Sequence, residues 1–149
     1  MKKLATILTA LILLFSAGSF AASGDNVTTK IKTAFDKNFA AASSVEWKKM
    51  SGIYFAYFKL NDQSLSAAYS EDGEMLGATR SITLSQLPLN VSLALQNFKG
   101  GYAYNDNVTE LVNDGQTTYF IGGDNSKCTV QLKSNASGDL TIEKKIRKK

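Results

Sequence analysis

The stretch "YSEDGEMLGATRSI", residues 69–82, reads as a strand, a tight turn and a second strand. Apolar and polar residues alternate on both sides of "EDG", where Gly73 can adopt the positive φ that such a turn needs. A similar stretch, "LKSNASGDLTIEKKI", returns at residues 132–146. The recurrence predicts two antiparallel hairpins, and it suggests that one structural unit occurs twice in the chain.

Upstream of the first hairpin, apolar residues recur every four positions, which predicts a helix over residues 27–39. Asp25 or Asn26 is available as its N-cap. The period then changes to two, which predicts strands with very short turns between them. Such short turns can join only antiparallel neighbours. The helical stripe is Val27, Ile31, Phe35 and Phe39, and the strands are expected near residues 45–49, 53–60, 64–70 and 74–82.

The second half repeats this order. "LSQLPLNVSLALQNF", residues 84–98, predicts a helix with Pro88 in its first turn, where a missing N–H costs little. Strands are expected near residues 107–113, 116–122, 127–133 and 139–146. The predicted fold is therefore α+β: a tandem repeat of one helix plus a four-stranded antiparallel meander, with about eight strands in one sheet and two helices on one face. The repeats span about residues 25–83 and 84–147.

Aligning the two halves by element order and apolar phase pairs Phe35 with Leu95, Phe39 with Phe98, Val45 with Val108, Tyr54 with Tyr119, Tyr69 with Leu132, and Gly73 with Gly138. Trp47 shares the phase of Val45 and is expected in the core. It has no counterpart in the second half, where Glu110 or Leu111 lies near the matching place.

Residues 1–21 are typical of a signal peptide, with two lysines, an apolar run and small residues before a cleavage point after Ala21. We therefore expect a periplasmic or secreted protein whose mature part, residues 22–149, is a single domain without a transmembrane segment. Cys128 is the only cysteine, so no intramolecular disulfide can form. It lies in phase with Val130 and Leu132, which predicts a buried, inert thiol; the alternative is a free thiol that pairs with another molecule.

The formal net charge of +4 misrepresents the folded part of the chain. The 17 basic residues include Lys2 and Lys3 in the signal peptide and five in the tail "EKKIRKK". The remaining body is slightly acidic, whereas a nucleic-acid-binding protein needs a broad basic face. We expect no nucleic-acid partner, and we expect the tail to be either a solvated terminus or a contact for an anionic lipid or polymer.

The sequence contains no histidine. This excludes Ser-His-Asp and Cys-His catalysis and most catalytic zinc sites. The acids of "SEDGE" are expected at a solvated hairpin tip, because their spacing does not provide the ligands of a calcium loop. We expect no catalytic residues, no cofactor and no metal site.

The stretch "IYFAYF", residues 53–58, is apolar on both faces of its strand. Tyr54, Ala56 and Phe58 are assigned to the helix-facing core. A sheet with helices on one face and water on the other should place polar residues opposite them. Large exposed apolar patches usually mark interaction sites. The predicted partner-binding residues of the open face are Ile53, Phe55, Tyr57, Met75 and Phe120; the alternative is that "KGGYAYND", with Tyr102 and Tyr104, covers this face.

The patterns "AFDKNFAAASSVEWKK", "AAYSEDGEML" and "QLPLNVSLAL" resemble the exported bacterial PepSY-like proteins, whose fold is similar to the β-lactamase inhibitor protein. The resemblance spans nearly the whole mature chain. It implies tandem helix-plus-sheet units, no catalysis, no bound cofactor, and binding or inhibition of another protein through the sheet. Ala40 departs from the family pattern, in which a proline follows the phenylalanine that matches Phe39.

These observations predict a non-enzymatic exported module that binds or inhibits an envelope or secreted protein through its open sheet face, with self-association also possible. Two alternatives stay open: a carrier of a small lipid or glycan ligand, and a histidine-free envelope hydrolase that uses carboxylates or a Ser-Lys pair.

Overall fold

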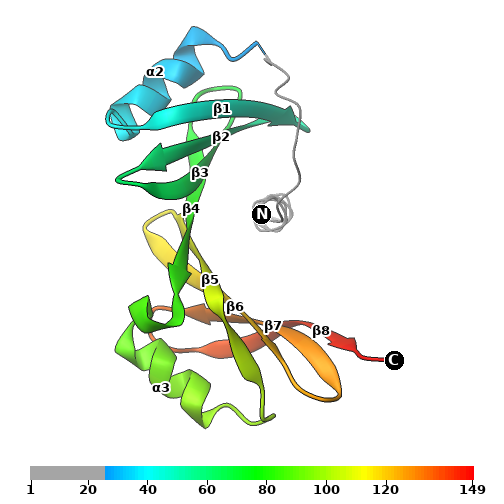
Figure 1. Ribbon diagram of the computed structural model, residues 1–149. Coiled ribbons are helices and arrows are strands. Elements are labelled where there is room, and N and C mark those ends of the chain that lie inside the picture. The colour runs from blue at the N-terminus through cyan, green and yellow to red at the C-terminus, as the bar shows by residue number, and fades with distance from the viewer. Residues whose placement is uncertain (1–25) are drawn as a thin grey trace. The chain divides into compact units, whose positions relative to one another are not determined.

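The computed structural model describes residues 26–149 (Figure 1). The predicted signal peptide, residues 1–21, lies outside this range. The described part contains two α-helices, a short 3₁₀ helix and one eight-stranded antiparallel sheet, in which the strands lie side by side in sequence order. The predicted α+β class with about eight strands is confirmed. The elements are α2 (Thr29–Asn38), β1 (Ser43–Met50), β2 (Ile53–Leu60), β3 (Gln63–Tyr69), β4 (Met75–Thr83), η1 (Leu84–Gln86), α3 (Leu89–Asn97), β5 (Ala103–Asn113), β6 (Gln116–Asp124), β7 (Cys128–Asn135) and β8 (Leu140–Arg147).

The chain divides into two compact units, one ending at Thr79 and the other beginning at Arg80. Each unit has its own hydrophobic core, built from one helix and strands of the sheet. We describe the two units separately and name them the first unit and the second unit.

Helix α2 begins two residues later than the sequence predicts. Thr28 caps it, because its hydroxyl accepts a hydrogen bond from the Ile31 amide at 3.4 Å. Asn26 is therefore not the cap, and Asp25 lies outside the described residues. The central part of the predicted apolar stripe is confirmed, because Ile31 and Phe35 are the two buried residues of the helix.

The core of the first unit is aromatic. The Phe35 ring lies 5.0 Å from that of Phe58 and 5.3 Å from that of Trp47. Tyr54, Ala56 and Tyr69 are buried in the same cluster, and Trp47 packs against it. The predictions that alternate β2 residues face the helix and that Trp47 belongs to the core are confirmed. Edge-to-face ring pairs of this kind add specific stabilisation to the burial of apolar area.

In the second unit, Pro88 is the N-cap of α3 and does not lie within the first turn as predicted. The 3₁₀ helix η1 comes before it and begins with a Thr83 amide that donates to the Gln86 side chain at 2.8 Å. Val91 and Leu95 of α3 are buried. They share a core cluster with side chains of three strands, namely Val108, Tyr119, Ile121, Val130 and Leu132.

Strand β5 starts at Ala103, four residues earlier than predicted. Tyr102 and Tyr104 pack against the core that contains α3, and the Tyr104 hydroxyl donates to the Leu95 carbonyl at 3.3 Å. These two tyrosines of "KGGYAYND" therefore lie on the helix side of the second unit, not on its open side as the alternative prediction had them. Gly123 makes the arrangement possible, because a Cβ there would lie 2.9 Å from the Tyr104 ring.

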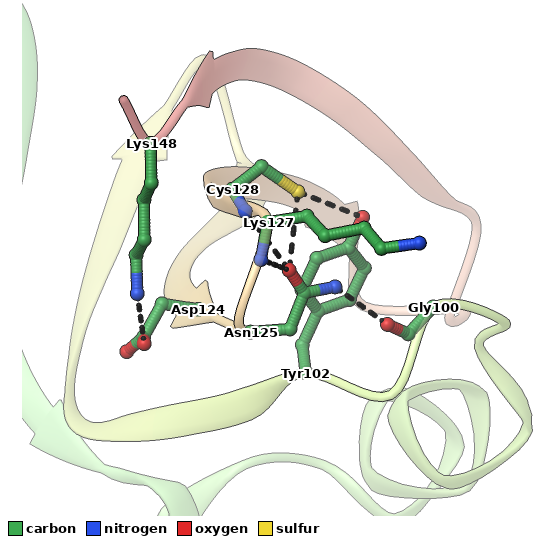
Figure 2. Close-up of polar contacts among 7 residues, drawn as sticks. All are labelled: Gly100, Tyr102, Asp124, Asn125, Lys127, Cys128 and Lys148. Atoms are coloured by element: carbon green, nitrogen blue, oxygen red, sulfur yellow. Dashed lines mark hydrogen bonds and ion pairs between the residues drawn. The ribbon is translucent and has the colours of Figure 1, made fainter.

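The turn between β6 and β7 is organised by Asn125 (Figure 2). Its side-chain oxygen accepts from the amides of Lys127 and Cys128, each at 2.9 Å, and its amide donates to the Gly100 carbonyl at 2.8 Å. The Cys128 thiol is buried and lies 3.8 Å from the Tyr102 hydroxyl. The prediction of a buried thiol is confirmed.

The strand registers correct one part of the predicted repeat alignment. Tyr54 lies opposite Lys49, and Tyr119 lies opposite Glu110. If the two tyrosines correspond, as predicted, the position that matches Trp47 is Val108. Val45 is then not its counterpart, because Trp47 and Val108 each lie two residues before the partner of the corresponding tyrosine.

Candidate protein-binding surface

The open face of the first unit is the side of β1–β3 that points away from α2. Neighbouring residues of a strand point to opposite faces, so Ile53, Phe55 and Tyr57 lie opposite the core residues Tyr54 and Phe58. We call this side of β1–β3 the open face. Opposite Phe55 on the neighbouring strands lie Lys48 and Ala68, and opposite Tyr57 lie Glu46 and Ser66.

The predicted binding residues differ in their exposure. Phe55 is only 1% exposed and Phe120 only 4% exposed. Ile53 and Tyr57 are half-buried. Phe55 and Phe120 are therefore too buried to contact a partner directly, whereas Ile53 and Tyr57 still reach the surface.

Met75 does not belong to the open face. Its sulfur lies 3.8 Å from the side-chain amide of Asn38 in α2, and the same amide donates to the Tyr69 hydroxyl at 3.2 Å. Tyr69 is part of the helix-side core, so Met75 lies on that side too. Thr79, four residues further along β4, lies on the open face, because its hydroxyl is hydrogen-bonded to that of Ser66, which lies opposite Tyr57. Simple alternation therefore fails between Met75 and Thr79.

A depression of about 260 Å³ lies beside Tyr57. It forms where β1 bulges away from β2, between the pairs Ser43–Lys59 and Glu46–Tyr57, and Ser44 has a positive φ of 53° in this bulge. Its lining residues come from three strands: Ser44, Glu46, Tyr57, Phe58, Lys59, Ser64 and Leu65.

The depression combines an aromatic ring with opposite charges. Glu46 lies directly across from Tyr57, and Lys59 lies two residues further along the same face. Within residues 26–149 neither Glu46 nor Lys59 takes part in an ion pair. The Lys48 ammonium lies 5.9 Å from the Tyr57 ring centre. Partial burial raises the pKa of the Tyr57 hydroxyl, so it is a neutral hydrogen-bonding group at neutral pH.

Sequence reasoning missed the polar part of this surface. Glu46 and Lys59 follow the same two-residue alternation as Tyr57 and could have been placed beside it. The depression itself could not have been foreseen, because it depends on the bulge at Ser44. In the second unit, Leu111 lies on the same face of the sheet as Phe120 and is 1% exposed, and sequence reasoning had not assigned it to a face.

Across residues 26–149 no three side chains of the metal-binding types come together. The buried Ser66 and Thr79 hydroxyls lie 2.8 Å apart and satisfy each other. Every buried side-chain nitrogen or oxygen in the described range has a hydrogen-bond partner.

Among residues 26–149 no helix has the length and apolar character needed to cross a membrane.

Solved structures share this fold. A BLIP-like protein from Bacteroides fragilis matches with a TM-score of 0.71 and 18% identity over 82% of this chain and 88% of its own. A DUF2874 family protein from Bacteroides ovatus matches with a TM-score of 0.70 and 22% identity over 83% of this chain and 89% of its own. A Bacteroides eggerthii protein proposed to be periplasmic matches with a TM-score of 0.69, at 17% identity over 81% of this chain and 88% of its own.

No family model matches the sequence, and no curated protein matches it. The likeness to the solved structures therefore concerns the fold. The chain has a BLIP-like fold, as the resemblance to the β-lactamase inhibitor protein implies.

Proposed function

We propose that this chain is an exported, non-enzymatic module that binds another protein through the open face of its first unit. The observation that carries the proposal is the half-buried Tyr57 beside a depression whose Glu46 carboxylate and Lys59 ammonium form no ion pair among residues 26–149. Aromatic side chains of this kind dominate the energetics of protein interfaces, and unpaired charges beside them select a partner of complementary charge.

The burial pattern changes the roles within the predicted residue set. We propose that Ile53 and Tyr57 contact the partner directly, together with Glu46 and Lys59. Phe55, which is buried, supports the surface from beneath. Phe120, buried in the second unit, is a support residue of that unit.

Three further points support a protein partner. A depression of about 260 Å³ is smaller than the roughly 300–1,000 Å³ of sites that enclose a small-molecule ligand, which favours a partner's side chain over a carried lipid or glycan. The chain has no histidine, which argues against an enzyme. The fold is shared with a protein described as BLIP-like. From the sequence patterns described above, we also propose that residues 1–21 are a signal peptide that directs export. We further propose that the two halves are a tandem duplication and that the chain is related to the PepSY-like proteins.

The test is affinity capture with the purified chain on a resin, using extracts of the cell envelope and of the culture medium. The Tyr57→Ser variant is compared with wild type and with Leu93→Ser, which removes an exposed apolar side chain from α3 in the second unit. We expect a protein that wild type and Leu93→Ser retain and Tyr57→Ser releases, with affinity at least about 30-fold weaker. Circular dichroism confirms that each variant is folded. Equal retention by all three proteins contradicts the proposal.

A further inference from the structure

Strand β8 forms the last edge of the sheet and has only β7 as a neighbour. Seven of its eight residues are exposed, and Leu140 is the exception. Five of the last six residues of the chain, which form the end of this strand and the tail after it, are basic. We call Lys144, Lys145, Arg147 and Lys149, with the exposed Ile142 and Ile146, the basic edge.

The basic edge carries cations on both faces of the strand. Lys145 lies opposite Val130 and Arg147 opposite Cys128, and both partners belong to the core beneath α3. Lys144 lies opposite Gln131 and Ile146 opposite Thr129, so these two point to the other face. A surface that approaches the edge of the sheet therefore meets cations from both sides of β8.

The end of the strand is held in place. The Lys148 amide donates to the Lys127 carbonyl at 2.9 Å, and its ammonium pairs with Asp124 at 2.8 Å (Figure 2). Only Lys148 is used in this way: in the described part of the chain, none of the four cations of the basic edge makes an ion pair. The strand thus presents ordered positive charge that no carboxylate of the described residues neutralises.

We propose that the basic edge binds the surface of an anionic lipid bilayer. Each cation near such a surface adds to the attraction, and the two isoleucines, 47% and 52% exposed, can enter the headgroup region beside them. Strand-to-strand pairing with a protein fits less well, because a bulge between Gln131 and Leu132 and the lysine side chains disfavour addition of a further strand. The proposal is independent of the open face of the first unit.

The test is co-sedimentation of the purified protein with vesicles of equal parts phosphatidylglycerol and phosphatidylcholine, and with vesicles of phosphatidylcholine alone. The variant Lys144→Gln/Lys145→Gln/Arg147→Gln removes three cations from the basic edge. The control Lys32→Gln/Lys37→Gln/Lys99→Gln removes three exposed cations elsewhere, so both variants have the same net charge. Circular dichroism checks that both are folded.

We expect wild type and the control to bind the anionic vesicles, and the basic-edge variant to bind them about 100-fold more weakly. Binding to the anionic vesicles should disappear at 1 M salt, where charges are screened within about 3 Å. Equal weakening of the two variants, or undiminished binding of the basic-edge variant, overturns the proposal. So does wild-type protein that binds polyglutamate but not the anionic vesicles, because the edge then recognises acidic polypeptide.

Discussion

Phe35 packs against four other aromatic rings in the core of the first unit. It is 3% exposed, and its ring centre lies 5.4 Å or less from those of Phe39, Trp47 and Phe58. Truncating a buried phenylalanine to alanine costs about 3–5 kcal/mol, because transfer energy is lost and a cavity remains. Each ring pair contributes about 0.5–1.5 kcal/mol more than its buried area. We therefore expect Phe35→Ala to lower the free energy of unfolding of the first unit by about 4–5 kcal/mol.

Trp47 is the only tryptophan of the chain and lies in this core, so its fluorescence reports the unfolding of the first unit. Urea titration of wild type and Phe35→Ala, followed at Trp47, measures the change. Leu93→Ala is the control, because this side chain is 45% exposed and belongs to the second unit; we expect a change within about 0.5 kcal/mol. A loss below about 1 kcal/mol for Phe35→Ala refutes the packing argument.

Three further predictions concern glycine geometry, pH and the turn at Asn125. Gly138→Ala should destabilise the protein more than Gly115→Ala, although both glycines have a positive φ. A Cβ at Gly138 would lie 2.6 Å from the Asn90 carbonyl oxygen, whereas a Cβ at Gly115 would meet nothing within 4 Å. Equal decreases in melting temperature for the two variants count against this contact. Burial raises the pKa of Tyr57, Tyr69, Tyr104 and Tyr119. The stability that these four neutral hydroxyls contribute is complete below pH about 10, the pKa of an unfolded tyrosine, and is lost as pH rises through the higher pKa of the folded state. The free energy of unfolding measured in urea should therefore fall above pH about 10. A free energy of unfolding that stays constant up to pH 12 is the opposing result. Asn125→Ala should lower the free energy of unfolding by about 1–3 kcal/mol. Asn125→Asp should lower it less, because the carboxylate still accepts hydrogen bonds from the amides of Lys127 and Cys128. Chemical denaturation in which the Asp variant is less stable than the Ala variant contradicts this.

The order of helices and strands could be read from the sequence because local periodicity determines it. The four-residue spacing around Ile31 and Phe35 and the alternation around Tyr54 and Phe58 predicted the helix-side core correctly. Cys128 followed from the same alternation. These features depend only on which residues are apolar and how far apart they stand.

The bulges and turns could not be read in this way. The bulge at Ser44 lies at the depression beside Tyr57, and a change of phase between Met75 and Thr79 of β4 leaves Met75 on the helix side. A one-residue change of phase moves every following side chain to the other face, and no apolar pattern marks where it happens. The burial of Phe55 and Phe120 was missed for a different reason, since alternation predicts the face of a side chain but not what covers it.

Site-specific photo-crosslinking tests the central claim most directly. p-Benzoylphenylalanine is introduced in place of Tyr57 or Ile53 on the open face, and in place of Leu93 on α3 as the control, and the cells are irradiated before lysis. We predict that positions 57 and 53 yield a covalent adduct with one and the same protein, which position 93 does not yield. Adducts confined to position 93, or none at positions 53 and 57 from proteins that are folded and expressed at wild-type level, contradict binding through the open face.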